Sequence, residues 1–261
     1  AGCLSVDFAR IQFTPDLMPT DVTGHAMYDP KTEQFRIRKG PAFTNLLLAD
    51  EINRASAKTQ SALLEVMQEK QITIEGKRFE LEQPFMVLAT QNPLDQEGTY
   101  PLPEAELDRF LFKILIDYPS REQEAEIVRM TLDGRIADDL QATGVSAITD
   151  GAGVTQLQRL TTCVTLDDGV LDYALRLARA TRDLPGLARG AGPRASIALC
   201  KAARAQALIE GRDFVIPDDV KAVSTPVLRH RIALGADAEI EGQSVEMLMR
   251  RLLDQVEAPR Q

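Results

Sequence analysis

Cysteine and histidine, the usual protein ligands of zinc, are rare in this chain, and tryptophan is absent. The 261 residues include three cysteines, two histidines and no tryptophan. Cys3, Cys163 and Cys200 show neither metal-ligand spacing nor a paired pattern, so we expect reduced thiols that act as buried filler in a cytosolic protein. His25 and His230 lie near neither a cysteine nor a Ser-containing elbow motif. The sequence therefore predicts no zinc site and no nucleophilic triad, and both histidines are expected to be surface or structural residues.

Long apolar runs and basic clusters are also missing. No apolar stretch approaches the roughly 20 residues that span a bilayer, and no charged-then-apolar leader opens the printed chain. We therefore expect a soluble, cytoplasmic protein without membrane insertion. The formal net charge is -9, and basic residues form no block of about five or more. Nucleic-acid binding driven by phosphate neutralisation is not expected, so the partners are proteins or small molecules.

The composition is that of an ordinary globular protein. Hydrophobic residues make up 44% and charged residues 26% of the chain, which is long enough for one large or two modest domains. Its first half alternates short β-rich runs with helical patterns, which favours an α/β layer structure with a mainly parallel sheet. The expected strands are residues 7–13, 45–50, 85–90 and 112–117.

Other segments of the first half predict a helix and two hairpins. A helix is expected over residues 57–70, with Ser56 as its N-cap. The period-two alternation at 71–82 and at 27–38 predicts hairpins that turn at Glu75-Gly76 and at Asp29-Pro30.

The β character nearly stops after Tyr118. Ser120 and Gln123 form a capping-box pattern that opens a helix, and residues 134–153 indicate a loop. We therefore predict an α/β domain at 1–118 and an all-helical domain at 119–261. Further helices are expected at about 155–162, 167–183, 194–210 and 217–229.

The buried run "LLLAD" ends in Asp50, and a second carboxylate, Glu51, follows it directly. Asp50 and Glu51 would lie at the carboxyl end of the sheet, where open α/β proteins bind ligands. Asp50 could hold Mg²⁺, and Glu51 could polarise a water molecule for attack on a γ-phosphate. The alternative is a strand that ends in two solvated acids.

Three further polar residues are candidates. Asn92, at the tip of the next apolar strand, could orient the attacking water, or it could be a turn residue before Pro93. Arg109 could be an arginine finger that reaches a neighbouring subunit's nucleotide, or it could form a surface ion pair with Asp108. Arg194 begins a helix, where a cation is unfavourable, so contact with phosphate would explain its position.

Several stretches together carry a family resemblance. They are "RIQFTPDLMPTDVTG", "LLLADEINRASAKTQSALLEVMQE", "ATQNP", "EGTYPLPEAELDRF" and "GPRAS". In this order and spacing they resemble the MoxR family of AAA+ ATPases over nearly the whole chain. The first and fourth stretches are specific to MoxR rather than to AAA+ proteins at large. The resemblance implies an AAA+ P-loop NTPase-type parallel-sheet domain, followed by an all-helical lid domain.

The resemblance also assigns roles to the candidates. It makes Asp50 and Glu51 the Walker B pair, Asn92 sensor 1, Arg109 the arginine finger and Arg194 sensor 2. It implies ATP and Mg²⁺ as cofactors and a homo-oligomeric ring, a hexamer, whose Arg194 faces the same crevice as the acidic pair. The implied function is ATP-driven, chaperone-like maturation of a client protein, often one with a von Willebrand factor A domain. The hairpins resemble inserts that point at the pore or at the client.

The printed sequence departs from the family in one respect. It contains no G-x-x-x-x-G-K-[ST] loop. We expect a fragment of a longer protein whose missing part carries a strand and this loop, and we expect the chain alone to be inactive. A strand missing between 85–90 and 112–117 would expose apolar edges there. The alternative is a regulatory or scaffold subunit that works without nucleotide because the loop was lost.

Overall fold

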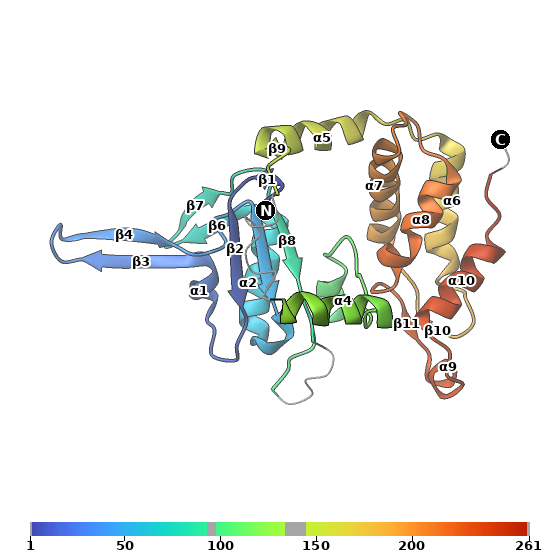
Figure 1. Cartoon of the computed structure of the whole chain (residues 1–261), viewed down its shortest axis with the longest axis horizontal. Coiled ribbons are helices and arrows are strands. Elements are labelled where there is room, and N and C mark those ends of the chain that lie inside the picture. Colours follow the sequence, from blue (N-terminus) through green and yellow to red (C-terminus); the bar gives the residue numbers. More distant parts are fainter. Residues whose placement is uncertain (1, 93–97, 134–144, 260–261) are drawn as a thin grey trace.

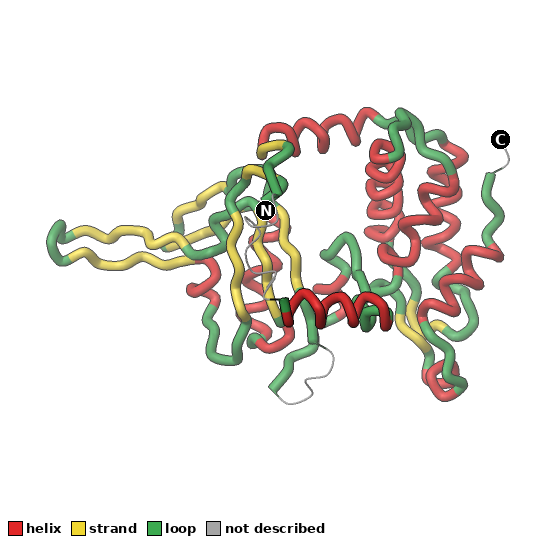
Figure 2. Tube along the Cα trace, in the orientation of Figure 1, coloured by secondary structure: helices red, strands yellow, loops and turns green. Residues whose placement is uncertain are grey.

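The computed structural model describes residues 2–92, 98–133 and 145–259. Strands gather in one half of the molecule and helices in the other (Figures 1 and 2). Within the described ranges, no helix combines the length and the apolarity that crossing a bilayer requires.

A parallel sheet of three strands forms the centre of the first half. Its strands are β2 (Phe8–Gln12), β5 (Leu46–Asp50) and β8 (Met86–Ala89), in the order β2-β5-β8. Three of the four predicted strands are thereby confirmed. The register pairs Gln12 with Asp50 and Ala49 with Ala89, so the carboxyl ends of all three strands lie at one edge.

Helix α2 (Ala57–Glu69) covers this sheet and begins at the predicted N-cap, where Ser56 Oγ accepts from the Thr59 N–H. Leu63 and Leu64 are fully buried, because positions at helical spacing on one face meet the sheet. The core around them also includes Ile11, Phe13, Val22, Leu47, Ile52, Val66 and Ile72.

Two antiparallel hairpins extend from this core, as predicted, although the longer one turns at residues 30–33 and keeps Asp29 in its first strand. The longer pairs β3 (Gly24–Asp29) with β4 (Gln34–Lys39), follows the short helix α1 (Pro19–Thr23), and projects away from the molecule (Figure 1). The shorter pairs β6 (Gln71–Ile74) with β7 (Lys77–Glu80). Glu75 and Gly76 both have positive φ, 48° and 75°, as a two-residue hairpin turn of type I′ requires.

The predicted strand at 112–117 is wrong. The structure assigns these residues to neither strand nor helix, and Ile114 and Ile116 are 74% and 92% exposed. Strand β8, the other segment predicted to have an apolar edge, pairs only with β5 among the described strands and leaves Met86 and Leu88 half exposed. An apolar run becomes a strand only where another strand accepts its backbone hydrogen bonds, and no described strand lies beside this run.

The second half is mainly helical. Helix α4 begins at the predicted capping box of Ser120 and Gln123. Helix α5 begins at Gly151, so its first three residues lie within the predicted loop, because Asp150 caps it by accepting from the Gly153 N–H. Residues 134–144 of that loop lie outside the described residues. The helices are α4 (Arg121–Leu132), α5 (Gly151–Cys163), α6 (Asp168–Ala180), α7 (Pro193–Ile209), α8 (Pro217–Leu228), α9 (Ala236–Ile240) and α10 (Val245–Gln255).

Several short elements were not predicted. They are α9, α10, the turn η1 (Ile52–Arg54), the antiparallel pair β10 (Leu187–Arg189) and β11 (Ala233–Leu234), and the parallel pair β1 (Leu4–Ser5) and β9 (Thr149–Asp150). The helix α3 (Glu104–Leu107), by contrast, confirms the short helix that the sequence predicts at about 104–110.

The buried apolar residues form two separate clusters. One lies between Ile11 and Leu102 in the sequence, and the other lies between Val164 and Leu252. A domain boundary near Tyr118 remains a prediction that fits this division. The expectation that the cysteines are buried filler was wrong for Cys3 and Cys163, which are exposed, whereas Cys200 is partly buried against the second cluster; all three thiols are free.

The ion pair of Arg212 with Asp219 predicts a loss of stability in acid. Asp219 is 4% exposed and accepts from both terminal nitrogens of Arg212, at 2.7 and 2.5 Å, and from the Ile216 N–H at 2.9 Å. Burial alone would raise the pKa of Asp219, but these hydrogen bonds hold it below its ordinary value of 3.8. Because the pKa is lower in the folded state, the stabilisation is present above that value and is lost as the pH falls below it.

We therefore expect Asp219→Asn to melt at a lower temperature than the wild type at pH 7. The difference should shrink as the pH falls below about 4. Thermal unfolding followed by circular dichroism at pH 7 and at a pH below about 4 measures this difference in melting temperature. A difference that stays the same at both pH values would contradict this role for the ionised carboxylate.

Candidate functional site

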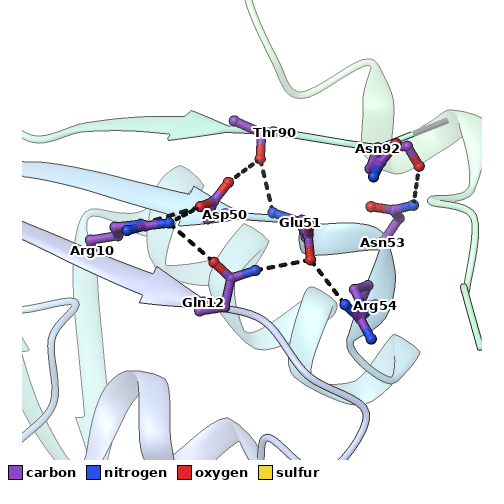
Figure 3. Close-up of polar contacts among 8 residues, drawn as sticks. All are labelled: Arg10, Gln12, Asp50, Glu51, Asn53, Arg54, Thr90 and Asn92. Carbon is purple, nitrogen blue, oxygen red and sulfur yellow. Dashed lines mark hydrogen bonds and ion pairs between the residues drawn. The ribbon is translucent and has the colours of Figure 1, made fainter. Parts of the chain in front are cut away.

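The acidic pair lies where strand β5 ends. Asp50 is the last residue of the strand, and Glu51 follows with φ 54° and ψ 50°, in the left-handed region. This conformation costs free energy for any residue other than glycine, and such strain is concentrated at functional sites. Neighbouring hydrogen bonds hold it: the Glu51 N–H donates to Thr90 Oγ1 at 2.9 Å (Figure 3), and the Ile52 N–H donates to the Thr90 carbonyl at 3.0 Å.

The Asp50 carboxylate is held by two donors. Thr90 Oγ1 donates to Asp50 Oδ1 at 2.6 Å, and Arg10 Nη2 donates to Asp50 Oδ2 at 2.5 Å. These bonds, that from Thr90 most strongly, lower the pKa of Asp50 below its ordinary value. Asp50 is therefore ionised at neutral pH, as a carboxylate that binds a cation must be.

The Glu51 carboxylate is oriented from both sides. Gln12 Nε2 donates to Glu51 Oε2 at 2.9 Å, and Arg54 Nη1 lies 3.2 Å from the same oxygen. Arg10 and Gln12 are two residues apart on β2, so their side chains project from the same face of the sheet. The Glu51 side chain thus points to the group of polar side chains around Asp50 rather than away into solvent (Figure 3).

Asn92 lies beside the turn that follows the acidic pair. Asn53, in η1, donates from Nδ2 to the Asn92 carbonyl at 3.2 Å (Figure 3). Gln60 is fully buried in α2 and donates from Nε2 to the carbonyls of Ile52, Ala55 and Tyr100. These bonds fix the backbone on which Glu51 and Asn92 are placed. The structure thus brings together three of the five predicted site residues.

Asp108 links Arg194 to the part of the chain that carries Arg109. Arg109 follows α3, and Asp108 beside it forms ion pairs with Arg231 at 2.8 Å and with Arg194 at 3.8 Å. The alternative prediction for Arg109, an ion pair with Asp108, is not found among the described contacts. Asp108 also gives Arg194 an anionic partner at the start of α7, so its position there no longer requires phosphate. That Arg194 faces the crevice of the acidic pair stays a prediction.

The site residues fit a magnesium nucleotide. In the part of the chain that the structure describes, no three His, Cys, Asp or Glu side chains cluster as a metal cage. Mg²⁺ in nucleotide sites needs only one or two protein carboxylates, since phosphate and water supply the other oxygens. An ionised Asp50 with a partly exposed side chain meets that requirement.

Sequence reasoning missed Arg10, Gln12 and Thr90. Their shared signal is polar residues near the ends of predicted strands, at 10, 12 and 90, where alternation places them on the face or at the tip next to Asp50. The signal becomes readable only when the strand order is known, because Arg10 and Asp50 are 40 residues apart.

Comparisons with known proteins show which family the chain belongs to. A model of the "ATPase family associated with various cellular activities (AAA)" matches residues 1–112, and a model of the "AAA lid domain" matches residues 179–252. The chain is 47% identical over 262 residues to Chaperone MoxR1 of Mycobacterium tuberculosis, covering 97% of this chain and 67% of that protein. The chain belongs to the MoxR family of AAA+ ATPases.

Two further similar proteins agree with this assignment. The chain is 46% identical over 259 residues to the uncharacterized protein YeaC of Bacillus subtilis, covering 99% of this chain and 79% of that protein. A solved structure of a candidate ATPase from Cytophaga hutchinsonii superposes with a TM-score of 0.90 at 41% identity, covering 99% of this chain and 80% of the other. The fold is therefore the AAA+ fold, a parallel-sheet domain with a helical lid, as the sequence predicted.

Proposed function

We propose that this chain forms the hydrolytic site of a MoxR-type ATPase that matures or activates a partner protein. One observation carries the proposal: Asp50 and Glu51 leave the same strand end with different surroundings. Asp50 is kept ionised by Thr90 and Arg10, while Glu51 is turned by a left-handed backbone into contact with Gln12 and Arg54. One carboxylate is thus suited to a cation and the other to a water molecule.

These positions suit each site residue to a separate role in hydrolysis. Bound Mg²⁺ and ATP would supply the γ-phosphoryl group and the charge that draws water toward it. Asp50 would hold the cation, directly or through water. Glu51 would accept a proton from the attacking water, and Asn92 would orient that water or a phosphate oxygen. Arg194 would contact phosphate from the helical lid.

Arg109 would serve the site of a neighbouring subunit. Its buried Nε has no hydrogen-bond partner among the described residues, so this guanidinium is not fully engaged within its own chain. A guanidinium stabilises the charge that spreads over the transferring phosphoryl oxygens. Hydrolysis would then require the assembled ring.

Thr90→Val should slow hydrolysis without abolishing nucleotide binding. Valine has the same shape but lacks the hydroxyl that donates to Asp50 and accepts from the Glu51 N–H. Loss of a hydrogen bond to a charged group costs about 1.5–3 kcal/mol, which corresponds to a loss of about ten-fold or more in kcat. Steady-state hydrolysis and nucleotide titration measure the two effects.

Thr90→Ser is the matched control because it keeps the hydroxyl. It should retain most of the activity. If serine and valine reduced kcat equally, packing of the threonine methyl group, not its hydrogen bonds, would explain the effect.

The overall function is tested on the full-length protein. We expect Mg²⁺-dependent ATP hydrolysis that is abolished by a chelator, and sedimentation of a six-subunit ring when ATP is present. We further expect a client with a von Willebrand factor A domain to bind the ring and to change the rate. A full-length protein that neither binds nor hydrolyses ATP would contradict this function and support the alternative, a scaffold subunit that works without nucleotide.

A further inference from the structure

Arg231 joins the helical lid to residues 107–113, which carry Arg109 and are called the Arg109 segment below. It lies just after α8, its side chain is 3% exposed, and a guanidinium has five N–H donors. Nε donates to Asp108 Oδ1 at 2.8 Å, and Nη2 donates to the carbonyls of Asp108 and Phe110 at 3.1 and 2.6 Å. Nη1 donates to the Leu111 carbonyl at 3.2 Å and to the carbonyl of Val227 in α8.

All the donors of this guanidinium are therefore satisfied, and four of the five acceptors belong to the residues on either side of Arg109. Buried carbonyls and a carboxylate need such partners, because an unpaired polar group in the interior costs free energy. A lysine could not replace this pattern, since an ammonium has three donors and no planar fork.

Neighbouring contacts hold the same segment. The ring nitrogen Nε2 of His230 donates to the Phe110 carbonyl at 3.0 Å, and the Lys113 N–H donates to the Pro226 carbonyl at 2.9 Å. Burial and the adjacent Arg231 lower the pKa of His230 to about 4, so its ring is neutral at physiological pH. His230 is thus structural, as expected from the sequence.

The opposite side of the segment rests on the α/β core. The side chains of Leu107 and Phe110 pack against the apolar cluster of the first half. The backbone of Arg109 is thus fixed between the sheet domain and the lid. A shift of α8 would move the four acceptors and, with them, the base of the Arg109 side chain.

We propose that Arg231 is a positioning residue for Arg109, which it holds ready for the neighbouring subunit and couples to movement of the lid. The proposal rests on the function proposed for Arg109 above. Arg231 is buried and its donors are already engaged within the chain, so it is not expected to bind nucleotide itself. Its loss should therefore lower kcat and leave nucleotide affinity unchanged, because a misplacement of about 1 Å can reduce a rate by about 100-fold.

Arg231→Lys in the full-length protein tests this inference, with Arg212→Lys as the matched control. Arg212 also makes a close pair with an aspartate of the lid, Asp219, but contacts no residue of the Arg109 segment in the described structure. Both variants should melt at lower temperature than the wild type. Only Arg231→Lys should reduce kcat, by about ten-fold or more, with an unchanged Kd for ATP.

Mixing subunits separates positioning from general damage. Arg231→Lys subunits should recover hydrolysis when mixed with Glu51→Gln subunits, which carry an intact Arg109 segment, and should not recover when mixed with Arg109→Ala subunits. If Arg231→Lys does not fold, Asp108→Asn removes the charged acceptor and leaves the backbone carbonyls, and the same kcat loss is expected.

The measurements distinguish failure of the positioning role of Arg231 from failure of the function proposed for Arg109. If the wild type hydrolyses ATP and Arg109→Ala does not, but Arg231→Lys behaves like Arg212→Lys, the positioning role is overturned and the proposed function stands. An unchanged kcat for Asp108→Asn, where that variant is the one measured, likewise overturns it. If Arg109→Ala leaves hydrolysis intact, the function proposed for Arg109 fails first.

Discussion

Replacing Arg109 by Ala in the full-length protein is expected to reduce ATP hydrolysis by about 10³-fold or more while nucleotide binding largely persists. The guanidinium acts only on charge that develops as the phosphoryl group transfers, so its loss affects the transition state and not the bound ground state. Steady-state hydrolysis and equilibrium titration with a fluorescent ATP analogue measure the two quantities.

Arg129→Ala is the control for this substitution. Arg129 is an exposed arginine of α4 that pairs with Glu126 one turn away. Its removal should leave hydrolysis unchanged. Equal losses of binding and hydrolysis in Arg109→Ala would mean that Arg109 has a structural role and would remove it from the mechanism.

Replacing Glu51 by Gln should slow turnover by about 10²- to 10⁴-fold and spare binding. Glutamine keeps the size of the side chain and an oxygen that can accept from Gln12, but it cannot take a proton from water. Single-turnover measurements with ATP in saturating amounts separate this chemical effect from a change in affinity.

Glu69→Gln is its control, because Glu69 is an exposed acid at the end of α2. It should hydrolyse ATP at the wild-type rate. Unchanged turnover in Glu51→Gln would show that another group activates water.

Local patterns predicted much of the sheet and of the site. The run before Asp50 is apolar, ends in two acids and is buried in alternation, so both its strand and its place at the sheet edge could be predicted. Asn92 could be placed for the same reason. The N-caps Ser56 and Ser120 also needed only their own neighbours, since a cap contacts residues within one turn.

Contacts between distant segments could not be predicted. Thr90 bonds to Asp50 across 40 residues, and Arg231 bonds to Asp108 across 123 residues. Nothing in the local sequence of Arg231 distinguishes a buried arginine that bonds to a distant segment from an exposed surface arginine. The strand predicted at 112–117 was wrong for the opposite reason. Its residues favour a strand, but a strand also needs a neighbouring strand, which a local pattern does not reveal.

The most direct test of a site shared between subunits mixes two inactive variants of the full-length protein. Glu51→Gln subunits supply an intact Arg109, and Arg109→Ala subunits supply an intact Glu51. In a ring assembled at random from equal amounts, about a quarter of the interfaces regain both groups. The account predicts that the mixture hydrolyses ATP at about that fraction of the wild-type rate, far above either variant alone. A mixture no more active than the average of the two variants would contradict it.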